Sequence, residues 1–166
     1  LHAARLHLLR NRGSGESGGR VLIVSSEAAL LPMFIHSYRR LGVLPLSADP
    51  AAYRGRPLDR RRSGFILVEQ AAAVVLERQD SPPAKQGNGQ LALLDTAVAS
   101  EGFDLVRPAP GMAALEHVAR QLLAHGPIDL LHPHATGTPD NDEAEMGVYA
   151  RILTDPQFQV SSFKSQ

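Results

Sequence analysis

The sequence contains no cysteine, which excludes disulfides and thiolate metal sites within the chain. It also lacks a net charge, because 17 basic side chains balance 17 acidic ones. No overall field therefore favours nucleic acid or an anionic membrane as a partner. No apolar run approaches the roughly 20 residues that a membrane-spanning helix needs. Nothing in the given sequence resembles a signal peptide, and it contains no internal repeat of 20 to 50 residues.

What remains is typical of a globular protein. Its 166 residues are enough for one domain with a real core. With 43% hydrophobic and 20% charged residues, the chain has the composition of a globular protein rather than a disordered one. The sequence begins at Leu1, within a stretch that already has helical spacing, and ends in a strand-like run that leads into a loop. We therefore expect the chain to be an internal segment of a longer protein.

Helical and strand patterns alternate along the chain. Helical spacing of apolar residues covers 1–10 and 112–123, and a capping box predicts a helix from 142 to about 153. Residues 28–34 are helical or irregular, with an interruption at Pro32. Strand patterns cover 21–24, 65–68, 72–77, 90–100, 128–131 and 157–162. The run 21–24 suits a strand buried on both faces. The alternation predicts an α/β fold with a mostly parallel or mixed sheet.

The stretch with the clearest chemistry is residues 128–142, where an apolar run ends in His132 and His134. A histidine just after a strand lies where ligands approach an α/β sheet, and it can donate a hydrogen bond or move a proton near neutral pH. Thr136 and Thr138 alternate, so in an extended loop both hydroxyls point to the same side, ready for a polar chain such as an amide.

Other interpretations of these histidines stay open at this point. His134 could be a loop histidine whose ring is satisfied by backbone groups. The pair His132 and His134 could form half of a metal site, which would need further ligands. The nearby acids Asp140 and Glu143 have a simpler role at the start of a helix. Asp142, with Glu145 three residues later, has the form of a capping box.

Two groups of basic residues have both an ordinary and a functional interpretation. Lys164, between serines after a strand, is either a solvated lysine or a buried ammonium paired with Glu145 or Asp142. The loop of residues 54–62, called here the arginine loop, contains Arg54, Arg56, Arg60, Arg61 and Arg62 with one acid, Asp59. It is either solvated charge with local ion pairs or a docking surface for an acidic protein.

Three segments together resemble the β-ketoacyl synthases, the condensing enzymes of fatty-acid and polyketide synthesis. Residues 56–77 resemble the family pattern R-P-F-D-x-x-R-x-G-F-x-x-G-E-G-A-G-x-x-x-L-E. Residues 134–145 resemble H-G-T-x-T-x-x-N-D-x-x-E, and residues 160–165 resemble V-S-S-x-K-S. The three occur in the family's order and at similar spacing, so the resemblance extends over nearly the whole chain.

The resemblance implies an α/β thiolase-like fold of two similar halves, assembled as a homodimer or as a heterodimer with another synthase subunit. Residues 1–80 would end the N-terminal half, residues 81–89 would be the connecting turn, and residues 90–166 would start the C-terminal half. It also implies a cytoplasmic acyltransferase without metal or other cofactor. Its substrates would be malonyl and acyl thioesters carried on the phosphopantetheine of acyl carrier protein, with no nucleic acid and no membrane as a partner.

The same resemblance assigns roles to single residues. His134 matches the first of two histidines that donate hydrogen bonds to the malonyl thioester oxygen. Thr136 and Thr138 match the threonines that bind the phosphopantetheine arm. Lys164 matches the lysine of the site, and Glu145, with Asp142 beside it, the acid that supports it. The acidic carrier protein would give the arginine loop a use.

The nucleophilic cysteine would lie before Leu1 and the second histidine after Gln166, so we expect residues 1–166 alone to be inactive. If the complete protein lacked that cysteine, it would be a non-condensing subunit of the chain-length-factor type. Several residues depart from family glycines: Ser25, Ser26, Val68, Gln70, Ala73 and Ala135. These changes from small to larger residues in close-packed crossings indicate a divergent member.

Overall fold

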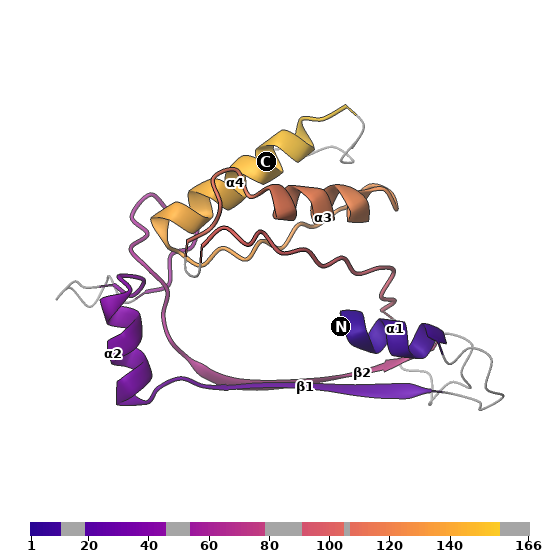
Figure 1. Cartoon of the computed structure of the whole chain (residues 1–166), viewed down its shortest axis with the longest axis horizontal. Helices are drawn as coiled ribbons and strands as arrows, with labels where there is room; N and C mark the ends of the chain where they lie inside the picture. Colours follow the sequence, from indigo (N-terminus) through magenta and orange to yellow (C-terminus); the bar gives the residue numbers. More distant parts are fainter. Residues whose placement is uncertain (11–18, 46–53, 79–90, 105–106, 157–166) are drawn as a thin grey trace. The chain divides into compact units, whose positions relative to one another are not determined.

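The computed structural model describes residues 1–10, 19–45, 54–78, 91–104 and 107–156 (Figure 1). The chain divides into two compact units, each built from two segments. The first contains residues 1–28 and 69–98, and the second contains residues 29–68 and 99–166. The mixture of helices and strands agrees with the predicted α/β class.

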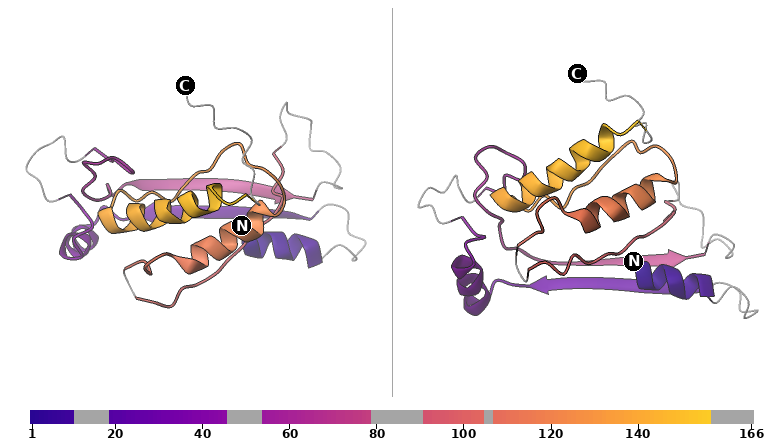
Figure 2. Two further views of the ribbon diagram at one scale, coloured as in Figure 1. Left: turned by 90° about the horizontal axis from the view of Figure 1, so that it is seen from above. Right: turned by 45° about the horizontal axis from the view of Figure 1, so that its top comes forward.

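The first unit is a strand pair with one helix against it. Strand β1 (Arg20–Ala28) pairs antiparallel with β2 (Glu69–Glu77), in a register that runs from Arg20 opposite Glu77 to Ala28 opposite Glu69. Helix α1 (His2–Arg10) contacts both strands and buries Ala4 and Leu8 (Figures 1 and 2). Two polar contacts, Arg5 to Asp95 at 2.9 Å and His2 to Thr96 at 2.8 Å, join α1 to residues 91–98.

The sheet differs from the prediction. Among the described residues, it is a two-stranded antiparallel pair rather than a mostly parallel or mixed sheet, and its apolar residues are not buried on both faces: Leu22 is 64% and Val24 65% exposed. Successive side chains of a strand point to opposite faces, and α1 covers only one of them. The glycine replacements at Ser25, Ser26, Val68, Gln70 and Ala73 are likewise exposed rather than close-packed.

Other predicted strands are also corrected. The stretch 65–77 forms a single strand that begins at Glu69, not two strands with a crossing between them. Residues 91–100 and 128–131 are not strands, because no other described residues form a ladder with them, and Leu130 is 82% exposed. The predicted strand 157–162 lies outside the described residues.

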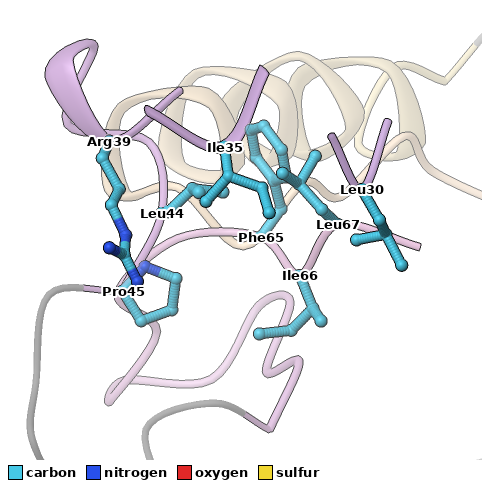
Figure 3. Close-up of a pocket in the computed structure, with 8 residues that line it drawn as sticks. All are labelled: Leu30, Ile35, Arg39, Leu44, Pro45, Phe65, Ile66 and Leu67. Carbon is cyan, nitrogen blue, oxygen red and sulfur yellow. The ribbon is translucent and has the colours of Figure 1, made fainter. Parts of the chain in front are cut away.

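In the second unit, helix α2 (Pro32–Arg40) lies beside residues 65–67. Pro32 is at the first turn, where the missing N–H costs nothing, so it starts the helix instead of interrupting it. Tyr38 packs edge to face against Phe65, with ring centroids 5.5 Å apart. Figure 3 shows the small apolar pocket that results, lined by Leu30, Ile35, Arg39, Leu44, Pro45, Phe65, Ile66 and Leu67.

Helices α3 (Ala113–Leu123) and α4 (Pro139–Leu153) lie side by side in the second unit (Figures 1 and 2). Helix α3 confirms the helix predicted from apolar spacing, and α4 confirms a helix that ends near Leu153, as predicted. Glu116 of α3 binds Arg120 and Arg151, each at 2.8 Å. Hydrogen bonds from these two guanidinium groups lower the pKa of Glu116. No helix in the described ranges is long and apolar enough to span a membrane.

The start of α4 corrects one more prediction. The helix begins at Pro139, with Thr138 as its N-cap residue, so Asp142 does not start it and the predicted capping box is wrong. Pro139 has the fixed φ that suits a first helical position. Asp142 thereby lies in the first turn and Glu145 about one turn later, on the face that also buries Val148, Tyr149 and Ile152. Their carboxylates are free to bind groups outside the helix.

Candidate active site

The site is built around residues 134–138, called here the His134 loop, which leads directly into α4. The loop passes very close to residue 64: the N–H of Gly64 donates to the carbonyl of Gly137 at 2.9 Å. A β-carbon on Gly137 would lie 2.9 Å from the Gly64 carbonyl oxygen, and one on Gly64 would lie 2.4 Å from that of Val43. Both positions also have positive φ, so both require glycine.

Glu145 binds the beginning of the loop. Its side chain is fully buried, at 1% exposed, and its oxygens accept from two consecutive backbone N–H groups. The N–H of His134 donates to Oε1 at 2.7 Å, and that of Ala135 donates to Oε2 at 2.8 Å. Two side chains of α4 complete the set: Tyr149 donates to Oε1 at 3.0 Å, and Asn141 donates to Oε2 at 3.4 Å.

Asp142 binds the end of the loop and the arginine loop at the same time. It too is 1% exposed. The N–H of Gly137 donates to Oδ1 at 2.9 Å, while the N–H of Leu58 donates to Oδ2 at 2.7 Å. Nε of Arg62 lies 3.8 Å from Oδ2, at the distance of an ion pair rather than a hydrogen bond. One carboxylate therefore joins two segments that are about 80 residues apart in sequence.

Asp142 and Glu145 each accept a hydrogen bond from a residue with an unusual backbone conformation. Leu58 has φ of 64° and Ala135 has φ of 44°, the left-handed region that a residue with a β-carbon rarely adopts. In each case the N–H of the strained residue donates to a carboxylate of α4. Ala135 is also a position where the family pattern has glycine, and its φ gives the physical reason for that glycine. The buried carboxylates offset the strain that the side chains introduce.

The hydroxyls of Thr136 and Thr138 lie 2.9 Å apart and share a hydrogen bond. They therefore face the same side of the loop, as their alternation predicts. Because one hydroxyl satisfies the other, the pair retains one O–H donor and free acceptor lone pairs for a ligand. This arrangement suits an amide group, which carries one donor and one acceptor.

The imidazole of His134 is exposed and makes no hydrogen bond with any described residue. The described residues therefore give no support to a ring satisfied by backbone groups. His132 is exposed as well, and among described residues no cluster of three His, Asp or Glu could hold a metal ion. The ligand set that a metal hydrolase would need is not found there. Lys164 lies outside the described residues, so its predicted pairing with Glu145 or Asp142 stays a prediction.

Known proteins match both this loop and the chain around it. Residues 91–166 match the C-terminal domain of β-ketoacyl synthases. The chain is 31% identical to 3-oxoacyl-[acyl-carrier-protein] synthase 2 of Mycobacterium leprae, over 99% of the chain and 39% of that protein. The chain belongs to the β-ketoacyl synthase family. It spans only about two-fifths of the length of this relative.

Further synthases are similar over shorter stretches. The 3-oxoacyl-[acyl-carrier-protein] synthase 2 of Mycobacterium tuberculosis is 35% identical over 62% of the chain and 26% of that protein. A 3-oxoacyl-[acyl-carrier-protein] synthase 1 of Haemophilus influenzae is 30% identical over 66% of the chain and 27% of that protein.

In this β-ketoacyl synthase chain, four contacts of the site were not predicted from the sequence. The bonds of Glu145 to the His134 loop, the contact of Arg62 with Asp142 and the hydroxyl of Tyr149 all appear only in the structure. The contact of Tyr149 with Glu145 could have been predicted from spacing, because residues four apart lie on the same face of a helix. Nothing in the sequence indicates that the backbone of Leu58 reaches Asp142.

Proposed function

We propose that the protein containing this chain is a β-ketoacyl-acyl-carrier-protein synthase of fatty-acid synthesis. The relatives that the chain resembles are named for this activity. The observation that carries the proposal is the exposed imidazole of His134. It belongs to a loop that also presents a pair of hydroxyls and whose backbone N–H groups are bound by Glu145. A proton donor on a rigid support is what a condensing enzyme needs where negative charge develops.

The proposed reaction is a decarboxylative Claisen condensation. The bond between the malonyl carboxylate and the α-carbon breaks, carbon dioxide leaves, and the electron pair forms a thioester enolate. His134 donates a hydrogen bond to the enolate oxygen and so stabilises this charge. The α-carbon then attacks the carbonyl of the acyl thioester on the enzyme, and the enzyme's thiolate leaves. Because the chain contains no cysteine, the proposal requires this nucleophile from another part of the protein.

The hydroxyls of Thr136 and Thr138 are proposed to bind the amide groups of the phosphopantetheine arm that carries the malonyl group. The acyl carrier protein is acidic in this interpretation and would dock on the arginine loop, where Arg60 and Arg61 are exposed. Asp142 supports this assignment, since it joins the arginine loop directly to the His134 loop. Docking and reaction would then occur on one connected structure.

Three further parts of the proposal extend beyond the described geometry. Lys164 would pair with Glu145 and complete the site. The protein would adopt the thiolase-like fold and act as a dimer in the cytoplasm, with phosphopantetheine on the carrier protein as the only prosthetic group in the reaction. Light scattering on the full-length protein would measure the dimer directly.

The proposal is tested by substituting His134 in the full-length protein. In His134→Ala, release of carbon dioxide from malonyl-acyl carrier protein falls by roughly 10²- to 10⁴-fold, because the enolate loses a donor. The matched control is His132→Ala, which removes an equally exposed imidazole two residues earlier and keeps the wild-type rate. Equal rates for both variants would contradict the assignment. A wild-type protein that forms no acyl-enzyme would instead indicate a non-condensing subunit.

A further inference from the structure

Tyr149 is a buried residue that the proposed reaction does not use. Its side chain is 7% exposed on the inner face of α4, one turn after Glu145. Its hydroxyl donates to Oε1 of Glu145 at 3.0 Å. The same oxygen accepts the N–H of His134 at 2.7 Å. Only this one carboxylate oxygen therefore separates the phenol from the backbone of the proposed catalytic histidine.

The geometry around Glu145 shows what the phenol contributes. Each carboxylate oxygen accepts one backbone N–H of the His134 loop and one side-chain donor of α4. The two backbone bonds require both oxygens to face the loop, which fixes the rotation of the carboxylate. The bond from Asn141 is long, at 3.4 Å, whereas the bond from Tyr149 has ordinary length. Among the described residues, Tyr149 is therefore the main side-chain donor that holds the carboxylate in this orientation.

The orientation of Glu145 also decides the conformation of Ala135. That residue is held at φ of 44°, a conformation that disfavours any residue with a β-carbon. If the carboxylate rotates away from the Ala135 N–H, the strained backbone loses its compensation and can relax. His134 precedes Ala135 directly, so relaxation of the backbone would move the imidazole.

We propose that Tyr149 is a positioning residue for His134, acting through the carboxylate of Glu145. The expected effect on decarboxylation rests on the proposed function, whereas the expected effect on the backbone of the His134 loop does not. Tyr149 fixes the carboxylate, the carboxylate fixes two consecutive backbone N–H groups, and these place the imidazole. A tyrosine that only fills space in the core could be replaced by phenylalanine without effect on the loop.

The experiment compares Tyr149→Phe with Tyr38→Phe in the full-length protein. Each variant loses one phenolic hydroxyl and keeps the ring. Tyr38 is the control because its ring packs edge to face against the ring of Phe65, a contact that does not need the hydroxyl. The first readout is amide hydrogen exchange at His134 and Ala135. We expect exchange about 10-fold faster in Tyr149→Phe and unchanged in Tyr38→Phe. Unchanged exchange in Tyr149→Phe would overturn the proposal.

The second readout separates positioning from general loss of structure. Decarboxylation of malonyl-acyl carrier protein is expected to fall roughly 5- to 30-fold in Tyr149→Phe. Acylation of the enzyme by acyl-acyl carrier protein, which does not use His134, is expected to keep its rate. An equal loss in both half-reactions would show a merely structural role and overturn the proposal. If the wild-type protein lacks decarboxylation, the proposed function fails, while hydrogen exchange still decides the role of Tyr149.

A double-mutant cycle tests whether Tyr149 acts through Glu145. In Glu145→Gln, one acceptor oxygen is replaced by an NH₂ group, so the side chain no longer binds both backbone N–H groups. If the phenol acts through this carboxylate, adding Tyr149→Phe to Glu145→Gln changes the exchange rate at His134 less than twofold. Full additivity of the two substitutions would overturn the proposed route.

Discussion

Asp142 and Glu145 are two buried carboxylates one turn apart on α4, and they differ in their partners. Both are 1% exposed, and each accepts the N–H of a non-glycine residue in the left-handed conformation. Asp142 has the guanidinium of Arg62 nearby. The described donors to Glu145 are all neutral: two backbone N–H groups, one amide and one phenol.

The difference shows two ways to keep a carboxylate inside a protein. A buried charge is costly unless it is paired or fully hydrogen-bonded. Asp142 is stabilised partly by an opposite charge, and it joins two distant segments. Within the described residues, Glu145 is stabilised by aligned dipoles, and it shapes two adjacent residues. Loss of Asp142 should therefore separate segments, whereas loss of Glu145 should distort the loop that presents His134.

The largest expected effect is that of Glu145→Ala. The N–H groups of His134 and Ala135 would be left without an acceptor in a buried place, at about 1–3 kcal/mol for each group. We expect the free energy of unfolding to fall by roughly 2–4 kcal/mol, measured by denaturant titration of the full-length protein. Glu143→Ala, on the exposed side of the same helix, is the control and should change it by less than about 0.5 kcal/mol. An equal loss of unfolding free energy in Glu145→Ala and Glu143→Ala would contradict the special role of the buried carboxylate.

Asp142→Asn is expected to have a somewhat smaller effect. The amide retains one acceptor oxygen, so one of the two backbone bonds survives, but the ion pair with Arg62 is lost. We expect a loss of about 1.5–3 kcal/mol, the range for hydrogen bonds to charged groups. Hydrogen exchange should rise at Leu58 and Gly137 and stay unchanged at His134. A rise at His134 as large as that at Leu58 would show that the two carboxylates do not have separate roles.

The pKa of Tyr149 gives a pH-dependent prediction. Burial is the main cause that raises this pKa to about 12, and the hydrogen bond to Glu145 adds to it. Its folded-state pKa thus lies above the unfolded value of about 10. The contribution to stability is complete below pH 10 and is lost as pH rises from about 10 to 12. In Tyr149→Phe this decline should be smaller than in the wild type, as followed by unfolding across that range, and an equal decline in both proteins would contradict it.

The smallest effect is predicted for Ala135→Gly. Glycine removes the left-handed penalty of about 1–2 kcal/mol, and its greater freedom in the unfolded chain cancels part of the gain. We expect the protein to become about 0.5–1 kcal/mol more stable. Ala144→Gly makes the same chemical change inside α4 and should destabilise by about 1 kcal/mol. The same sign for both variants in thermal unfolding would contradict the account of φ at Ala135.

Much of the helical structure could be predicted because a helix depends on neighbours in sequence. Apolar spacing predicted α3, the acidic residues after the loop predicted a helix that ends near Leu153, and the family pattern identified the loop from His134 to Thr138. The strand predictions were less accurate, because a strand needs a partner that is distant in sequence, and an apolar run such as 128–131 does not show whether it has one. Pro32 was interpreted as an interruption, although proline is also favoured in a first helical turn.

The polar contacts of the site were the least predictable part. Asp142 and Glu145 have the spacing of a capping box, and a helix start at Pro139 moved both carboxylates inside the helix. The partner of Asp142 at Leu58 is a backbone N–H, which leaves no trace in the side-chain sequence. By contrast, Ala135 at a family glycine position was a visible signal of unusual backbone, and its φ of 44° now explains it.

The central claim is that Glu145 supports the backbone of His134 and thereby the proposed chemistry. The most direct measurement is the rate of carbon dioxide release from malonyl-acyl carrier protein by Glu145→Gln, with Glu143→Gln as the control, in full-length proteins of matched thermal stability. The account predicts a roughly 10²-fold loss for Glu145→Gln, because a small displacement of a catalytic group has that effect, and no loss for Glu143→Gln. A wild-type rate in Glu145→Gln would contradict it.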